Sequence, residues 1–364
     1  MYPQDEQILN ELVTVRNLSE RTELLYKRII TLYTTFHQTP FKELLEEAET
    51  EEENGIRWKK RKIRERLLSF RNYLYANYMS STAKMNFSKI LTIYKHYEIE
   101  IHTLPPVSEK QSDKSYIYFD DLPTKELIQK ALSVARPVHQ RIILFQVSTG
   151  CSAVDTLNLR VKDLMDSVRE YYGGDSVYEM INLLKDNTDV IPCFRMKRRK
   201  TGKVYYTFCT NECFRSICMY LLTRKGLMLS DRVFKITQLH LMQLFREVND
   251  LLGLGTVGEN GFVKFRSHML RKFHASMLYN DGMSLDTVNE LQGKAKNKTD
   301  SSYFMEDPRK LKLEYVRHMG VLVVNDSVGV VSDEYVDLKD RVLKLEQLLC
   351  DGMGGELGLL DRFF

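Results

Sequence analysis

Four residues in three separated stretches carry side chains that could together break a phosphodiester bond. His268 and Arg271 stand three positions apart, so a helix would present both on one face. Tyr303 follows further along the chain, and Lys200 stands in a short basic turn. Without a metal ion, this reaction needs a hydroxyl to attack phosphorus, cations for the non-bridging oxygens and a proton donor for the leaving oxygen. A phenol, a guanidinium and an ammonium meet these three needs.

The choice of residue types is specific to this chemistry. A tyrosyl phosphate ester keeps the energy of the broken bond, so the reaction can be reversed. Guanidinium suits phosphate because its planar fork matches the geometry of two phosphate oxygens. The proton donor is less well defined, because Lys197 and Lys203 flank Lys200 and compete with it for this role.

Several short motifs occur in a fixed order along the chain, and together they resemble the signature of tyrosine recombinases. The resemblance covers residues 17–320, and the first hundred residues resemble the helical core-binding domain of archaeal and archaeal-virus integrases. The motifs are Ser148-Thr149-Gly150, Leu157-Asn158-Leu159, Asp163-Leu164, Lys200-Thr201-Gly202-Lys203, His268-x-x-Arg271, Gly282-Met283-Ser284, Leu291-Gln292-Gly293 and Tyr303.

The resemblance implies a role for each candidate residue. Tyr303 would be the nucleophile, Arg271 would bind the scissile phosphate and Lys200 would protonate the leaving oxygen. His268 would transfer a proton and contact the phosphate. Lys294 stands where the family usually has a second His or Trp; its ammonium can bind phosphate but lacks the near-neutral pKa of imidazole. No cofactor and no metal is implied.

The implied function is site-specific recombination or integration. The protein would cleave and rejoin double-stranded DNA at attachment sites through a 3′-phosphotyrosyl intermediate on Tyr303. It would work as a homo-tetramer assembled on DNA. The resemblance to archaeal and archaeal-virus integrases suggests that the protein is encoded by a virus or provirus. The implied fold is a helical core-binding domain followed by a mixed α/β catalytic domain.

One departure from the family pattern matters for activity. The family's first arginine follows the Thr-Gly pair by two or three residues, where this chain has Ser152 and Ala153. The next arginine, Arg160, is predicted to lie on the far side of its helix. Either another cation fills the gap, or the protein is slow, or it binds DNA without cleaving it. The cations considered for the gap are Lys197, Arg198 and Arg199.

A third function with the same chemistry is type IB topoisomerase-like relaxation, in which the cut strand is rejoined to itself. Recombination, DNA binding without cleavage and strand relaxation therefore remain the three hypotheses. They differ in whether a covalent adduct forms and in whether dilute protein relaxes a supercoiled plasmid.

Hydrophobic periodicity predicts a fold that is mainly α with a small antiparallel β-sheet. The first hundred residues have helical spacing, and about four helices are expected there. Strands are predicted at Val177–Leu183, Ile191–Met196 and Val204–Phe208, the last two joined by the basic turn. Helices resume at Asn211 and run to about Gly320, with a glycine-rich break at Leu252–Gly261. No alternation of strands and helices is seen, which excludes a doubly wound fold.

Four segments are predicted from composition and breakers. Residues 1–106 form the helical DNA-binding domain, and the polar stretch 107–117 is the linker. Residues 118–320 form the catalytic domain, and 321–364 form a tail. The tail contains an amphipathic stretch from about Asp333 to Leu349, which could fold onto its own core or pack on a neighbouring protomer.

The formal net charge is only +4, but basic residues are concentrated in two clusters, Arg57–Arg66 and Arg195–Lys203. Such clusters can neutralise phosphates locally. A solvated helix face, pairing with the acidic stretch Glu43–Glu53 or a charged hairpin tip would explain them equally well. The residues expected to bind DNA are Arg57, Lys59, Lys60, Arg61, Lys62, Arg64, Lys197, Arg198, Arg199 and Lys203.

Composition argues for a cytoplasmic protein. No stretch approaches the roughly 20 apolar residues that cross a bilayer, and the first residues lack the pattern of a secretory signal. The six cysteines include no C-x-x-C pair and read as free thiols in a reducing compartment, not as a disulfide frame or a zinc site.

Overall fold

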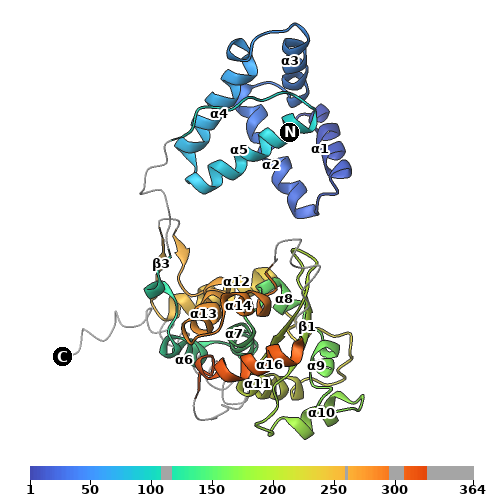
Figure 1. The fold of residues 1–364 in the computed structure, drawn as a ribbon, viewed down its shortest axis with the longest axis vertical. Helices are drawn as coiled ribbons and strands as arrows, with labels where there is room; N and C mark the ends of the chain where they lie inside the picture. The colour runs from blue at the N-terminus through green and yellow to red at the C-terminus, as the bar shows by residue number, and fades with distance from the viewer. Residues whose placement is uncertain (108–116, 259–260, 295–306, 326–364) are drawn as a thin grey trace, which may run out of the picture. The chain divides into compact units, whose positions relative to one another are not determined.

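The computed structural model describes residues 1–107, 117–258, 261–294 and 307–325. The chain divides into two compact units, residues Met1–Tyr116 and Ile117–Phe364. Figure 1 colours the first unit blue to cyan and the second green to red. The described part is mainly helical, as the sequence predicts, and contains two small antiparallel sheets where the sequence predicts one. None of the helices in the described ranges is long and apolar enough to cross a membrane.

Unit 1 is a bundle of five α-helices within its described residues. Tyr33 on α2 lies at the centre of the core; its ring contacts Phe41 and Phe70, and its hydroxyl lies 3.1 Å from that of Tyr94. Apolar residues at spacings of three and four build this core, so each helix buries one face. The elements are α1 (Pro3–Val15), α2 (Glu20–His37), α3 (Phe41–Glu53), the 3-10 turn η1 (Trp58–Lys60), α4 (Lys62–Asn77) and α5 (Ser80–His96).

Unit 2 contains the remaining helices and both hairpins. Its elements are η3 (Phe119–Asp121), α6 (Lys125–Val134), α7 (Pro137–Thr149), α8 (Ala153–Leu157), α9 (Val161–Ser167), α10 (Val177–Leu184), β1 (Cys193–Lys197), β2 (Val204–Phe208), α11 (Asn211–Leu222), α12 (Gln238–Leu251), β3 (Thr256–Val257), β4 (Phe262–Val263), α13 (Ser267–Asn280), α14 (Leu285–Leu291), α16 (Pro308–His318) and η4 (Met319–Val321).

Helix α7 is the centre of unit 2. It is buried along nearly its whole length and contacts α8, α11, α13 and β2 (Figure 1). Its sequence explains this position, because apolar residues occupy all sides of the helix and not one stripe. The helix ends at Gly150, whose φ of +63° is a left-handed C-cap. Helices α8, α11 and α13 and strand β2, which lie in different parts of the sequence, therefore pack around α7.

The hairpin β1–β2 forms as the sequence predicts. Cys193 pairs with Phe208 and Lys197 with Val204 in an antiparallel register. The backbone N–H groups of Arg198, Thr201 and Gly202 close the turn, and Gly202 has a φ of +72°. Arg199 and Lys200 lie exposed at its tip.

The predicted strand at Val177–Leu183 is wrong, because this segment is helix α10. Val177, Met180, Ile181 and Leu184 are buried together at helical spacing, and the hydroxyl of Ser176 caps the helix by accepting from the N–H of Glu179. The β-branched and aromatic residues suggested a strand, but burial of one helical face decides the conformation. The glycine-rich break holds a small hairpin, β3–β4, that the sequence does not predict.

Candidate phosphate-binding site

Arg271 on α13 fastens two loops to each other. Its guanidinium donates through Nη1 to the carbonyl oxygen of Gly150, and through Nη2 to that of Gln292 at 2.7 Å. The side chain of Gln292 returns a hydrogen bond from Nε2 to the carbonyl oxygen of Arg271 at 2.9 Å. Only 9% of Arg271 is exposed. The predicted phosphate-binding guanidinium is therefore held rigidly where the Thr-Gly and Gln-Gly motifs meet.

The glycines of these two motifs are required by close approach. A Cβ on Gly150 would lie 2.5 Å from Nδ1 of His274, and a Cβ on Gly293 would lie 2.5 Å from the ring of Tyr205. Both glycines have positive φ, +63° and +59°, which other residues rarely adopt. The glycines of the Thr-Gly and Gln-Gly motifs thus allow the two turns to pack closely against α13 and β2.

A second guanidinium lies beside the first. Arg198, at the end of β1, donates from Nη1 to the carbonyl oxygen of Gly293 at 2.8 Å, while Arg271 holds the preceding carbonyl, that of Gln292. Burial lowers the pKa of Arg271, and the charge of Arg198 lowers it further. Burial and then the charges of Arg271 and Arg198 also lower the pKa of Lys294. We call Arg198, Arg271 and Lys294 the cation cluster.

Of the lysines in the hairpin, Lys203 is tied to α14. Its ammonium lies 2.7 Å from Oε2 of Glu290 and donates to the carbonyl oxygen of Lys294 at 2.9 Å. Lys200 stands exposed at the tip of the same turn and forms no ion pair or hydrogen bond with the described residues. This difference separates two candidates for the proton donor that the sequence left open.

Ser152 stands at the sequence position where the resemblance leads one to expect the family's first arginine. It caps α8, and its hydroxyl donates to Oδ2 of Asp155 at 2.7 Å. The other oxygen of Asp155 accepts the backbone N–H of Arg199 at 3.0 Å, so the hairpin docks on α8. Arg160 points elsewhere and donates to the carbonyl oxygen of Ser230 at 3.0 Å.

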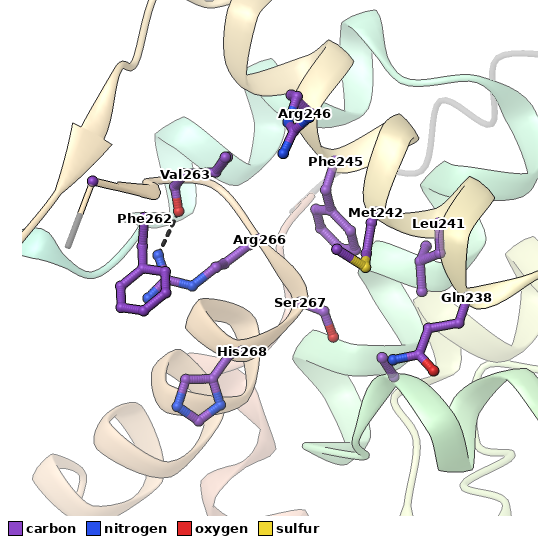
Figure 2. A pocket seen from close by; sticks show the side chains of 12 residues that line it. Gln238, Leu241, Met242, Phe245, Arg246, Phe262, Val263, Arg266, Ser267 and His268 are labelled. Carbon is purple, nitrogen blue, oxygen red and sulfur yellow. Dashed lines mark hydrogen bonds between the residues drawn. The ribbon is translucent and has the colours of Figure 1, made fainter. Parts of the chain in front are cut away.

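His268 stands in the first turn of α13 and lines a pocket of about 310 Å³ (Figure 2). The other lining side chains are mostly apolar, from α12 and β4, with Met242 and Phe262 among them. Partial burial lowers the pKa of His268, and nearby positive charges lower it further. At neutral pH this imidazole is therefore unprotonated and able to accept a proton.

The basic residues of unit 1 divide into free and paired groups. Arg57, Lys59 and Lys60 are exposed, and Arg64 is half-buried. Arg61 lies 2.6 Å from Glu52 with only 9% of its side chain exposed. Glu47 binds Lys62 and Arg66 at 2.9 and 2.7 Å. Part of the acidic stretch thus pairs with the basic cluster, and η1 presents its most accessible cations.

Tyr303 lies outside the described residues, as do residues 108–116 of the predicted linker 107–117 and residues 326–364 of the predicted tail 321–364. The described chain stops at Lys294 of the cation cluster and resumes at Asp307, the N-cap of α16. The nucleophile assignment therefore continues to depend on sequence order. Asp155 and Glu290, which hold the hairpin in place, are not identified by the sequence analysis, although Ser152-x-x-Asp155 has the spacing of a helix cap.

Two buried histidines make the stability of unit 2 sensitive to acid. Burial lowers the pKa of His139 to about 3, and that of His274 to about 3, from about 6.5 in an unfolded chain. As pH falls from about 6.5 toward 3, the unfolded chain takes up these protons and the folded chain does not. Stability is then lost, by about 2 kcal/mol per histidine at pH 5.

The expected result is a melting temperature that falls steadily between pH 7 and 5. His139 packs edge-on against Phe245, and neither of its ring nitrogens has a hydrogen-bond partner among the described residues. His139→Phe should therefore flatten the pH dependence, whereas Lys225→Gln, which removes an exposed lysine, should leave it unchanged. Equal slopes for the two variants in differential scanning calorimetry would contradict this account.

No protein-family model matches the chain, and no curated protein matches it. Solved structures do. The XerA recombinase structure matches at 16% identity and a TM-score of 0.33, covering 86% of this chain and 96% of that one. The Tn1549 transposon integrase bound to circular intermediate DNA matches at 14% identity and 0.42, covering 85% and 98%. The integrase from mycobacterium phage Brujita matches at 11% and 0.36, covering 92% and 98%. Each of these TM-scores lies below 0.5, and none of these structures identifies the function of this chain.

Proposed function

We propose that this protein is a site-specific DNA recombinase of the tyrosine type. The observation that carries the proposal is the cation cluster, in which Arg271, Arg198 and Lys294 meet although they come from three distant segments. Like charges brought this close repel each other, and a bound phosphate would relieve that repulsion. The segment that bears Tyr303 starts directly after Lys294.

In the proposed reaction, the phenol oxygen of Tyr303 attacks phosphorus while the bond to the 5′ oxygen breaks. The cluster stabilises charge on the non-bridging oxygens. His268, unprotonated at neutral pH, accepts the phenolic proton, and Lys200 gives a proton to the leaving 5′ oxygen. The resulting 3′-phosphotyrosyl ester is then attacked by a 5′-hydroxyl of a partner strand. The exposed cations of η1 contribute phosphate contacts that carry no sequence information.

The partner would be double-stranded DNA at attachment sites, with several copies of the chain assembled on it as a tetramer. The resemblance to archaeal and archaeal-virus integrases favours a viral or proviral element as the DNA concerned.

The test uses a pool of nicked duplexes with a randomised central region and the full-length chain. Cleavage next to the nick releases a short strand and traps the protein on DNA. We expect an adduct that survives denaturing detergent, and a nuclease-trimmed nucleotide on the peptide that contains Tyr303. An adduct mapped to another residue would refute the nucleophile assignment.

A second candidate function is DNA binding without cleavage, favoured by one observation. Ser152 occupies the place of the family's first arginine and serves as the cap of α8. Binding of the pool without any covalent adduct would support this function. Relaxation of a supercoiled plasmid by dilute protein would instead point to a topoisomerase-like activity.

A further inference from the structure

The proposed reaction requires more positive charge at the phosphate than Arg271 alone supplies. Negative charge develops on two non-bridging oxygens in the transition state, and preorganised donors must face both. Two of the N–H groups of Arg271 already donate hydrogen bonds to the carbonyl oxygens of Gly150 and Gln292. With serine at position 152, a second guanidinium has to come from another segment.

From these contacts we infer that Arg198 is the second phosphate-binding guanidinium, supplied by the hairpin in place of the arginine missing at Ser152. This inference rests on the proposed function. Arg198 and Arg271 bind consecutive carbonyl oxygens of one turn, those of Gly293 and Gln292. The two guanidinium groups are therefore held by the same turn, close enough for the charge of Arg198 to act on Arg271.

Two neighbouring cations, Lys203 and Arg199, are committed to other contacts. The ammonium of Lys203 is neutralised by Glu290. Arg199 is drawn toward α8, because its backbone N–H binds Asp155 and its Nη2 lies 3.4 Å from Oδ1 of Asn158. Arg198 donates one hydrogen bond to Gly293 and is half-buried, so it is anchored while part of its fork faces solvent.

The charge balance of the cluster also points to an anion. Burial and then the charge of Arg198 lower the pKa of Arg271, and Asp155 is the carboxylate whose charge opposes this; burial and both arginines lower the pKa of Lys294. Both oxygens of Asp155 already accept hydrogen bonds, from Ser152 and from the backbone of Arg199. The three cations carry more positive charge than the single carboxylate of Asp155 can balance. The remaining positive charge favours binding of a phosphodiester.

The first arm of the test needs no activity. Thermal unfolding of the full chain is followed while inorganic phosphate is titrated at constant ionic strength. Wild type and Arg317→Ala, which removes an exposed arginine of α16, should gain several degrees. Arg198→Ala should lose most of that gain, and Arg198→Lys should retain part of it. An unchanged gain in Arg198→Ala would overturn the inference, whether or not the chain cleaves DNA.

The second arm measures adduct formation on a cleavage site recovered from the nicked pool. Arg198→Ala should be slower than wild type by about a hundredfold, the usual effect of losing one oxyanion donor. Replacing a non-bridging oxygen of the scissile phosphate by methyl removes the charge that Arg198 meets. The deficit of Arg198→Ala should then shrink to a few-fold, whereas a merely structural defect would persist.

The outcomes separate the inference from the function it rests on. An adduct on Tyr303 that forms at equal rates in wild type and Arg198→Ala would sink the inference and leave the recombinase proposal intact. Absence of any adduct from wild type would sink the recombinase proposal, and the phosphate titration would still decide whether Arg198 binds phosphate.

Discussion

Replacing Arg271 by alanine is expected to slow DNA cleavage by between about a hundredfold and a thousandfold and to destabilise unit 2. Both effects come from one side chain. Its charge faces the phosphate in the proposed reaction, and its N–H groups satisfy the carbonyls of Gly150 and Gln292. Leaving two buried carbonyls without a donor costs about 2 kcal/mol or more.

Arg271→Lys separates the two roles. Lysine keeps the charge but cannot hold both carbonyls with a planar fork, so part of the rate should survive while stability still falls. Lys310→Ala, on α16, removes an exposed cation outside the cluster and should leave both properties near wild type. Single-turnover adduct formation gives the rates, and urea unfolding gives the stabilities. An Arg271→Ala chain that cleaves normally would show that the phosphate lies elsewhere.

The fold was largely predictable because its main signals are local. The apolar run Val138–Ser148 has the length of a buried helix and is too long for a typical strand, and it lies within α7. The strand Val204–Phe208 appears with the predicted bounds. Segment Val177–Leu183 was mistaken for a strand because a short apolar run fits both periods, and only its packing against α9 and α11 decides.

The sequence selects candidate residues for the site one by one, but it does not predict how they are arranged. Sequence motifs selected Arg271 and Lys294, since their spacing along the chain is informative by itself. The place of Arg198 beside them depends on a turn-to-turn contact with Gly293, and no periodicity encodes such a contact. The same holds for Glu290, which looks like an ordinary exposed helix residue until Lys203 is seen against it.

Lys200→Ala is expected to slow strand cleavage by about a hundredfold or more, whereas Lys203→Ala should act mainly on stability. The physical reason is that the two ammonium groups have different partners. Lys203 is bound to Glu290 and to the carbonyl oxygen of Lys294, so it serves to hold the hairpin on α14. Lys200 lies exposed at the tip, where its proton is available to a leaving oxygen.

A leaving group that needs no proton distinguishes the two lysines. If the 5′ oxygen of the cleaved bond is replaced by sulfur, the departing thiolate is a weak enough base to leave unprotonated. The rate of Lys200→Ala should then return close to that of wild type, because the step that Lys200 assists has been removed. Lys203→Ala should show no such recovery and should melt at a lower temperature, since its ion pair with the largely buried Glu290 and its hydrogen bond to Lys294 are lost. Recovery in Lys203→Ala instead of Lys200→Ala would reverse the two assignments, and recovery in Lys197→Ala would assign the proton donor to β1.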